Sequence, residues 1–365
     1  MEDLKGFVEP ATPSHTYDVL DKRLLVGLAH NARFSPTQLK KLVNLSKDGI
    51  RHRIEKMHKN YTILQNILIL NPFVLGFKFH TLALEINFPS INEEMILIGK
   101  LAMHPNTAWI GQCLGKYNLI VNIITSKEDT KSIVSQIRKI CESNLGKSEL
   151  VEITQMHSYN LLPKWFINET GISERVLYKQ KNSFNEILSY PSINQVKRTS
   201  IDKLDVSIIR SLSQDSSKSI ANIADELKSP FNTIKNRLRS LIKNEIILAF
   251  RPLINSAFLH FFPFVALIKL NSDSEIDNIR SFLKNHGNAG FVLETKGKWS
   301  FEWFAANKNN AQIYKDTKEL REKFKSIKDI TTLFIVKDYK MTFIPEYVLN
   351  NGLDSCLMKK RLFKP

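Results

Sequence analysis

Apolar positions along the chain follow two kinds of spacing, and both recur in the same order in the second half. Between residues 18 and 60 they lie three or four apart, which predicts three short amphipathic helices. These positions are Leu20, Leu24, Leu25 and Leu28, then Leu39, Leu42 and Val43, then Ile50, Ile54 and Met57. Ser35-Pro36 and Ser46 are typical of helix starts, and only Asn44-Leu45 separates the last two helices. This pattern indicates a helix-turn-helix, and the β-rich residues 62–70 that follow predict a wing.

Residues 77 to 157 have a different pattern, which predicts a βαββαβ unit. Strands are expected at 77–86, 107–114, 118–125 and 149–157, and helices at 92–104 and 127–141. The two middle strands form a hairpin across Gly115, Lys116 and Tyr117. Elements in this order indicate a ferredoxin-like fold.

The whole arrangement is repeated along the chain. Asp18-Val-Leu-Asp21 returns as Asp202-Lys-Leu-Asp205, and the other matches in the helical part keep the same offset. Gly115-Lys116 returns as Gly297-Lys298, at an offset two residues shorter than in the helical part. The other matches in the βαββαβ part keep this shorter offset. The second βαββαβ unit is expected at 261–270, 274–286, 289–295, 300–306, 309–325 and 330–338. A register kept over such a length indicates a tandem duplication.

The predicted fold class is α+β, with two copies of a winged helix-turn-helix followed by a ferredoxin-like βαββαβ domain. The expected order is a winged helix-turn-helix at 17–71, a ferredoxin-like domain at 76–158, a linker at 159–200, a second winged helix-turn-helix at 201–255, a second ferredoxin-like domain at 260–345, and a basic C-terminal tail at 346–365. The linker is expected to hold one helix around 173–188.

Composition narrows the class of protein. The chain is 43% hydrophobic and 24% charged, close to globular averages, which argues against disorder. Cys113, Cys141 and Cys356 are odd in number and far apart, so they predict no disulfide framework and no zinc ribbon. The N-terminus lacks a signal-peptide pattern, and neither apolar stretch (61–86 and 258–270) is typical of a membrane span. We therefore expect a cytoplasmic protein without a membrane partner.

The formal net charge of +16 favours polyanionic partners such as double-stranded DNA. On the third helix of each copy, a polar face lies opposite the apolar stripe, as on a recognition helix. The candidate DNA-binding residues are Lys47, Asp48, Arg51, His52, Lys56 and Lys59 in copy one and Asn232, Lys235, Asn236, Arg239 and Lys243 in copy two. A solvated helix face is the alternative interpretation.

The two polar faces differ, which predicts an asymmetric operator. Asp48, His52 and Glu55 of copy one correspond to Asn232, Asn236 and Arg239 of copy two. Arg53 and Arg237 lie at the edge of the apolar stripe. For each of them, the sequence is compatible with an ion pair to a first-helix acid or with a contact to a DNA phosphate. No phosphate loop, nucleophile elbow or HExxH metal helix occurs, so we predict neither enzyme activity nor a cofactor nor a metal.

Several residues together carry a family resemblance. They are Leu20-Asp21, Arg33, Ser46, Ile50, Arg53-Ile54, Ile63, Gly76 and Gly115-x-x-Asn118, with Leu204-Asp205, Ile234, Arg237-Leu238, Ile247 and Gly297 in the second copy. In order and spacing the chain resembles the Lrp/AsnC family of transcription regulators. Members usually carry one such unit and dimerise through the βαββαβ domains. We therefore infer an intrachain pseudo-dimer, and further association into a higher homo-oligomer stays open.

The resemblance also implies a small-molecule effector held near the hairpin of the second domain. The candidate effector-binding residues are Lys116, Tyr117, Asn118, Lys298, Trp299 and Ser300. Simple turn chemistry at the glycines is the alternative. The family has glycine where Asn60 and Asn244 stand, and asparagine tolerates the left-handed conformation expected there.

An enzyme is the rival interpretation. Sirohaem decarboxylases resemble this architecture, and Lys116-Tyr117-Asn118-Leu119 is similar to their Tyr-Asn hairpin. The histidine and the Tyr-Arg pair expected around that hairpin are absent from Asn106-Thr-Ala-Trp-Ile-Gly-Gln-Cys113.

Overall fold

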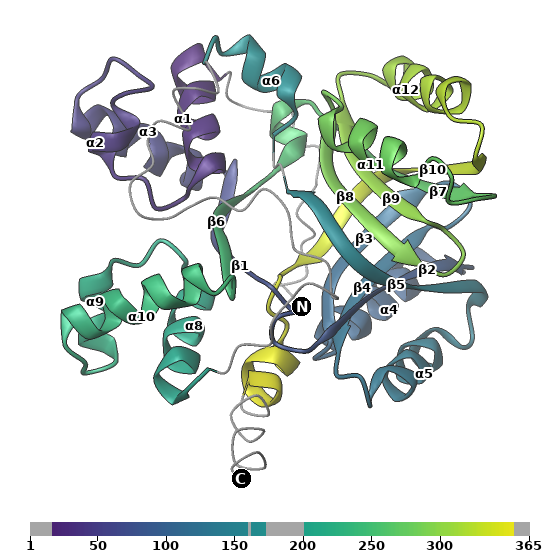
Figure 1. Cartoon of the computed structure of the whole chain (residues 1–365), viewed down its shortest axis with the longest axis horizontal. Coiled ribbons are helices and arrows are strands. Elements are labelled where there is room, and N and C mark those ends of the chain that lie inside the picture. Colours follow the sequence, from purple (N-terminus) through teal and green to yellow (C-terminus); the bar gives the residue numbers. More distant parts are fainter. Residues whose placement is uncertain (1–16, 160–161, 173–200, 354–365) are drawn as a thin grey trace.

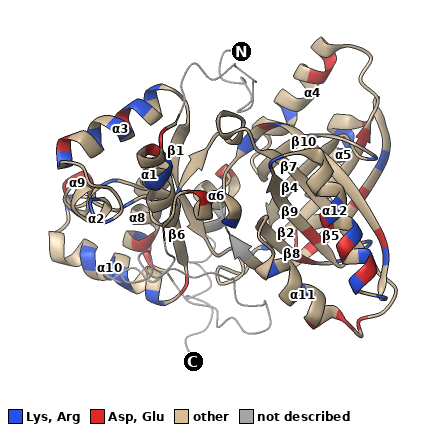
Figure 2. Ribbon diagram, turned by 90° about the horizontal axis from the view of Figure 1, so that it is seen from above, with Lys and Arg blue, Asp and Glu red and all other residues tan. Residues whose placement is uncertain are grey.

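The computed structural model describes residues 17–159, 162–172 and 201–353. Two groups of short helices lie on one side of the molecule and a closed barrel of strands lies on the other (Figure 1). The same division is visible from above in Figure 2. This mixture of helices and antiparallel strands confirms the predicted α+β fold class.

Each helix group is a three-helix unit. Copy one contains α1 (Val19–His30), α2 (Pro36–Leu39) and α3 (Lys47–Lys59), and copy two contains α8 (Lys203–Gln214), α9 (Ile220–Glu226) and α10 (Phe231–Lys243). The side chains of Ser35 and Ser46 accept hydrogen bonds from the amides of Gln38 and Gly49, as N-caps do. The expected two-residue turn at Asn44-Leu45 is wrong, because α2 ends at Leu39 and the connection spans residues 40–46.

The predicted wing strand of each copy pairs with the other copy. Strand β1 (Ile63–Leu70) lies antiparallel to β6 (Ile247–Ile254) in a two-stranded sheet. A backbone hydrogen bond also ties each helix-turn-helix to the strand of the opposite copy. The Ala32 amide donates to the Phe250 carbonyl at 3.0 Å, and the Ser216 amide donates to the Asn66 carbonyl at 3.1 Å. Because Ser216 is the repeat counterpart of Ala32, and Phe250 that of Asn66, the two units are joined about a pseudo-twofold axis.

The ferredoxin-like elements occur in both copies in the predicted order. Copy one has β2 (Lys78–Ile86), α4 (Ile91–Met103), β3 (Thr107–Leu114), β4 (Leu119–Thr125), α5 (Thr130–Cys141) and β5 (Leu145–Tyr159). Copy two has η2 (Ser256–Leu259), β7 (Phe262–Leu270), α11 (Ile276–Asn285), β8 (Ala289–Lys296), β9 (Phe301–Asn307), α12 (Asn310–Lys323) and β10 (Ile327–Met341). Strands β3, β4 and β5 recur as β8, β9 and β10 at the offset that relates Gly115 to Gly297, as the sequence predicted.

The eight strands close into one barrel of order β10-β3-β4-β2-β5-β8-β9-β7. Strands β5 and β10 have 15 residues each and are longer than predicted. Each one pairs with a strand of its own copy and, further along, with a strand of the other copy: β5 with β2 and β8, and β10 with β7 and β3. The two copies therefore share a continuous sheet.

Parts of the predicted linker and tail belong to the folded core. Helix α6 (Lys164–Glu169) begins soon after β5, and Leu162 and Phe166 are buried with α1 of the first helix-turn-helix. After β10, Val348 in η3 (Val348–Gly352) and Leu353 are buried in the core that contains the second helix-turn-helix. The expected helix at 173–188 and the basic residues from 359 to 364 lie outside the described residues.

The left-handed residue after each third helix is one position later than expected. Asn60 and Asn244 both have φ of −88°, whereas Tyr61 has φ of +57° and Glu245 has φ of +56°. The Tyr61 amide bonds to the His58 carbonyl and the Thr62 amide bonds to the Met57 carbonyl, at 3.1 and 2.9 Å. These two bonds are those of a Schellman motif, whose left-handed residue is usually glycine.

Because a side chain strains the left-handed conformation, Tyr61→Gly is expected to stabilise the protein by about 1 kcal/mol. Tyr61 is 68% exposed, so little packing is lost. Chemical denaturation measures the change. The neighbouring Asn60→Gly is the control and is expected to give no gain, because Asn60 has an ordinary negative φ. An equal gain from both variants would contradict this account.

Candidate nucleic-acid interface and barrel cavity

The predicted recognition faces are exposed on α3 and α10. The exposed candidates are Lys47, Asp48, Arg51, His52, Lys56 and Lys59 on α3 and Asn232, Asn236, Arg239 and Lys243 on α10, while Lys235 is half-buried. Lys and Arg residues are distributed along both helices, in the half of the molecule away from the barrel (Figure 2). Ile50 and Met57, and Ile234 and Leu238 in copy two, are buried beneath these faces. The core therefore fixes which face of each helix meets solvent.

The two faces differ in charge as well as in residue type. On α3 the Arg51 guanidinium lies 2.8 Å from the Asp48 carboxylate, so this arginine is already paired within its own helix. On α10 the residue that corresponds to Asp48 is Asn232, and Arg239 stands where α3 has Glu55. The α10 face thus offers two amides and a guanidinium, which are the groups that pair with adenine and guanine edges.

Arg53 and Arg237 pair with first-helix acids. Arg53 Nη1 lies 2.7 Å from Asp21 and 2.8 Å from Asp18, and Arg237 Nη1 lies 2.6 Å from Asp202. The hydrogen bond to Asp21 raises the pKa of Arg53. The sequence left two roles open for these arginines, an ion pair with a first-helix acid and a phosphate contact. The structure shows the ion pair for both.

Arg53→Ala is expected to lower the free energy of unfolding by about 1 to 2 kcal/mol, because it leaves the buried Asp21 carboxylate without its guanidinium. The control is Arg51→Ala, which breaks an exposed pair and is expected to change stability by less than about 1 kcal/mol. Urea denaturation of both variants compares the two losses. Equal losses of stability in the two variants would contradict a larger contribution from the Arg53–Asp21 pair than from the exposed Arg51–Asp48 pair.

The two hairpin tips meet at one end of the barrel. Tyr117 and Trp299 are buried, with relative exposures of 1% and 3%, and their rings pack edge to face with centroids 5.6 Å apart. Lys298 Nζ donates to the Tyr117 hydroxyl at 3.0 Å and pairs with Glu149. Tyr117 and Trp299 belong to a buried cluster with barrel residues such as Val265 and Leu333, and Lys116 is exposed.

The residue after each tip is tied to the neighbouring strand. The Asn118 side chain accepts from the Ile86 amide at 2.8 Å and donates to the Ile86 carbonyl at 2.7 Å. The Ser300 amide donates to the Ile268 carbonyl at 2.8 Å. The structure thus brings the predicted effector residues together and gives most of them packing or hydrogen-bonding roles. Effector binding by these residues stays a prediction.

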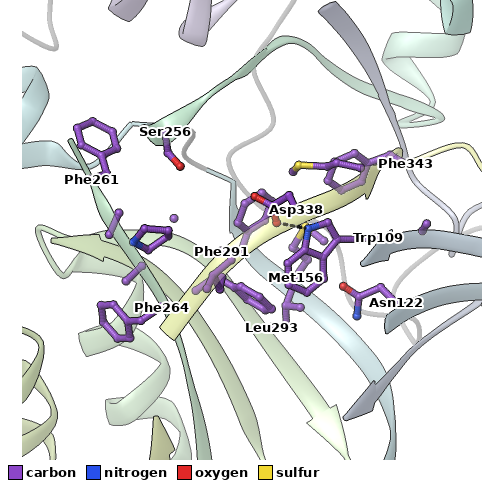
Figure 3. Close-up of a pocket in the computed structure, with 18 of the residues that line it drawn as sticks. Trp109, Asn122, Met156, Ser256, Phe261, Phe264, Phe291, Leu293, Asp338 and Phe343 are labelled. Carbon is purple, nitrogen blue, oxygen red and sulfur yellow. Dashed lines mark hydrogen bonds between the residues drawn. The ribbon is translucent and has the colours of Figure 1, made fainter. Parts of the chain in front are cut away.

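A cavity of about 180 Å³ is lined by barrel strands and by segments that join the barrel to the helix units, such as Ser256 and Phe261 (Figure 3). It is lined by residues of both copies, among them Trp109, Asn122, Met156, Phe291, Phe304 and Asp338. Sequence reasoning missed this site. A position-by-position comparison of the two copies would have pointed to it, because Asp338 stands where copy one has Met156 and Asn122 stands where copy two has Phe304.

Two acids lie in or near this cavity. The Asp338 carboxylate accepts a hydrogen bond from Trp109 Nε1 at 2.8 Å, and burial raises the pKa of Asp338 to about 6. Glu302 is fully buried in the barrel, and burial raises its pKa to about 8. Within residues 17–159, 162–172 and 201–353, no group of three or more His, Cys, Asp and Glu side chains is arranged to hold a metal ion.

Comparisons with known proteins agree with the fold. No protein-family model matches the sequence. An uncharacterized HTH-type transcriptional regulator of Pyrococcus furiosus is 24% identical over 149 residues, which is 40% of this chain and 95% of that protein. A second such regulator, from Pyrococcus abyssi, is 25% identical over 148 residues, which is 40% of this chain and 97% of that protein. Each match is about the size of one copy.

Among solved structures, the sirohaem decarboxylase NirDL has a TM-score of 0.59 at 10% identity and covers 94% of this chain and 100% of its own. AsnC of Escherichia coli has a TM-score of 0.33 at 21% identity, covering 38% of this chain and 93% of its own. No helix among the described residues is long and apolar enough to cross a membrane. By these sequence matches, a stretch of the chain about as long as one copy is similar to HTH-type transcriptional regulators.

Proposed function

We propose that the chain is a cytoplasmic, sequence-specific DNA-binding transcription regulator that acts as a single-chain pseudo-dimer. The observation that carries the proposal is the pair of exposed faces on α3 and α10, joined through the β1–β6 sheet. Because this sheet ties each helix-turn-helix to the opposite copy, the two recognition helices are held in one arrangement. Such an arrangement suits a DNA site with two half-sites at a fixed spacing.

Charge supports the same function. The basic side chains on α3 and α10 can contact phosphates, which would make binding strongly dependent on salt. The paired Arg53 and Arg237 are not counted among these contacts, since each is engaged with first-helix acids. Base readout is assigned to the exposed polar side chains, above all Asn236 and Arg239.

Fluorescence anisotropy tests the proposal. The full chain is titrated with the duplex upstream of its own gene and with a shuffled duplex of equal length, at several salt concentrations. A preference of ~10³-fold or more for the native duplex, with steep salt dependence, is expected. Lys56→Ala and Lys59→Ala together are expected to weaken binding to both duplexes and to reduce the salt slope. Equal binding of the two duplexes by the unmodified chain would contradict a sequence-specific regulator.

An enzyme of the sirohaem decarboxylase type is the second candidate, because the NirDL structure matches the architecture over nearly the whole chain. The composition of the cavity speaks against it. Asp338 lines the cavity, and its carboxylate would repel a tetrapyrrole that carries carboxylates. The visible absorption spectrum after addition of a carboxylated iron porphyrin separates the candidates: a spectral shift supports the enzyme, and an unchanged spectrum supports the regulator.

A further inference from the structure

The barrel cavity has the size and the walls of a small-molecule site. An engineered protein cavity of about 150 Å³ holds benzene, so the cavity of about 180 Å³ has room for a six-membered ring with a short side arm. Its aromatic walls include Trp109, Phe291 and Phe304, and Trp109 meets Phe304 edge to face at 5.5 Å. Ser256 and Phe261 lie at the side of the cavity toward the helix units (Figure 3).

One wall of the cavity carries a carboxylate that lacks a cationic partner. Asp338 extends from β10 toward Trp109, whose indole N–H is 2.8 Å from Oδ1 (Figure 3). No Lys, Arg or His side chain among the described residues forms an ion pair with Asp338. Asp338 is half-buried, and removal of a carboxylate from water without a cationic partner is costly, so a positively charged ligand would offset that cost.

A second acid, Glu302, is linked to the cavity by hydrogen bonds. Asn122, which lines the cavity, donates to the Thr81 hydroxyl at 2.7 Å, and Thr81 donates to Glu302 at 3.0 Å. The other carboxyl oxygen of Glu302 is buried without a hydrogen-bond partner. Asp338 thus lines the cavity, and Glu302 is connected to it through Thr81 and Asn122. Both acids belong to a protein whose net charge is +16.

Three hydrogen-bonding residues of the cavity wall differ from their repeat counterparts. In the alignment of the two copies, Trp109, Asn122 and Asp338 correspond to Phe291, Phe304 and Met156. Phe291, Phe304 and Met156 therefore contribute aromatic and sulfur surface where their repeat counterparts contribute hydrogen-bonding groups. This asymmetry would orient a ligand that is polar at one end and apolar at the other.

We propose that the barrel cavity binds a small organic cation, an amine attached to an apolar body of about the size of a benzene ring. The ammonium group pairs with the Asp338 carboxylate and lies against the aromatic walls, where the ring faces attract cations. The apolar body packs on Phe291, Phe304 and Met156. This site is separate from the hairpin tips, and the inference does not depend on DNA binding.

Isothermal titration calorimetry with 2-phenylethylamine tests the site, with 2-phenylethanol and 3-phenylpropionate as neutral and anionic matches. The amine is expected to bind at least about tenfold more tightly than the alcohol, and the acid is expected not to bind. Asp338→Asn, which keeps an oxygen for the Trp109 N–H, is expected to remove the preference for the amine. Asp329→Asn, an exposed change on the same strand, is the matched control and should retain it.

A second variant addresses the cavity itself. Met156→Phe adds volume on the apolar side and is expected to weaken amine binding at least tenfold while the circular dichroism spectrum stays native. Three results would overturn the proposal: equal affinity for amine and alcohol, unchanged amine binding in a folded Asp338→Asn, or no binding of the amine by the unmodified chain. Each of these readouts is independent of whether the chain binds DNA.

Discussion

Glu302→Gln is expected to remove a pH-dependent loss of stability. Glu302 on β9 has a relative exposure of 0%, and burial raises its pKa to about 8 from an ordinary value of 4.5. Above pH 4.5 the unfolded chain releases this proton while the folded chain retains it. Stability therefore falls as pH rises from about 4.5 to about 8. A glutamine cannot ionise, so the variant lacks this fall.

The size of the effect follows from about 1.4 kcal/mol per unit of pKa difference. Between pH 4.5 and pH 7, the free energy of unfolding of Glu302→Gln is expected to rise by about 3 kcal/mol relative to the unmodified chain. Urea denaturation at a series of pH values measures this difference. Glu322→Gln, at an exposed position on α12, is the control and should leave the pH profile unchanged. A Glu302→Gln difference that does not change with pH would refute the assignment.

Local features of the fold were predictable because they depend on neighbouring residues. The spacing of Leu24, Leu28 and Ile50 indicated the helices, and Ser35 and Ser46 indicated two helix starts. The order βαββαβ was predictable from alternation and from the hairpin glycines. The repeat was also visible, since the offsets found in the sequence are the ones that relate the elements of the two copies in the structure.

The contacts between the copies could not be predicted from local pattern. Residues 62–70 have the same β-rich pattern whether they form a hairpin wing or pair with β6, because pattern shows the strand and not its partner. The C-terminal ends of β5 and β10 were missed for the same reason, since residues 158–159 and 340–341 pair with strands of the other copy. Tyr61 was missed because the position of a left-handed residue depends on where the helix stops.

The residues of the candidate sites also fall into two groups: those that local pattern predicted and those that only tertiary packing brings together. The exposure of Asn236 and Arg239 followed from helical periodicity. The pairing of Arg53 with Asp21 needed the packing of α3 on α1. The cavity residues Asp338 and Trp109 come from different copies and meet only after the barrel closes. Their functional significance therefore depends on tertiary structure and not on any motif.

The double change Asn236→Ala and Arg239→Ala on α10 is expected to weaken binding at one half-site of the operator by about 10²-fold or more. Both side chains are exposed, and α10 has no acid at the positions that correspond to Asp48 and Glu55 of α3. A bidentate contact between such a side chain and a base is worth about 1 to 3 kcal/mol. Loss of two contacts should therefore abolish discrimination at the bases that α10 reads.

The matched change on α3 is His52→Ala with Glu55→Ala, at the positions that correspond to Asn236 and Arg239. Affinities are measured for a set of duplexes in which each base pair of the native site is changed in turn. The α10 variant should lose its preferences in one half of the site and the α3 variant in the other half, because in the proposed complex α3 and α10 read separate half-sites. If both variants lose preferences at the same bases, or if the unmodified chain prefers two identical half-sites, the asymmetric operator is refuted. Arg53→Ala should leave the preferences intact, since that guanidinium is engaged with Asp18 and Asp21.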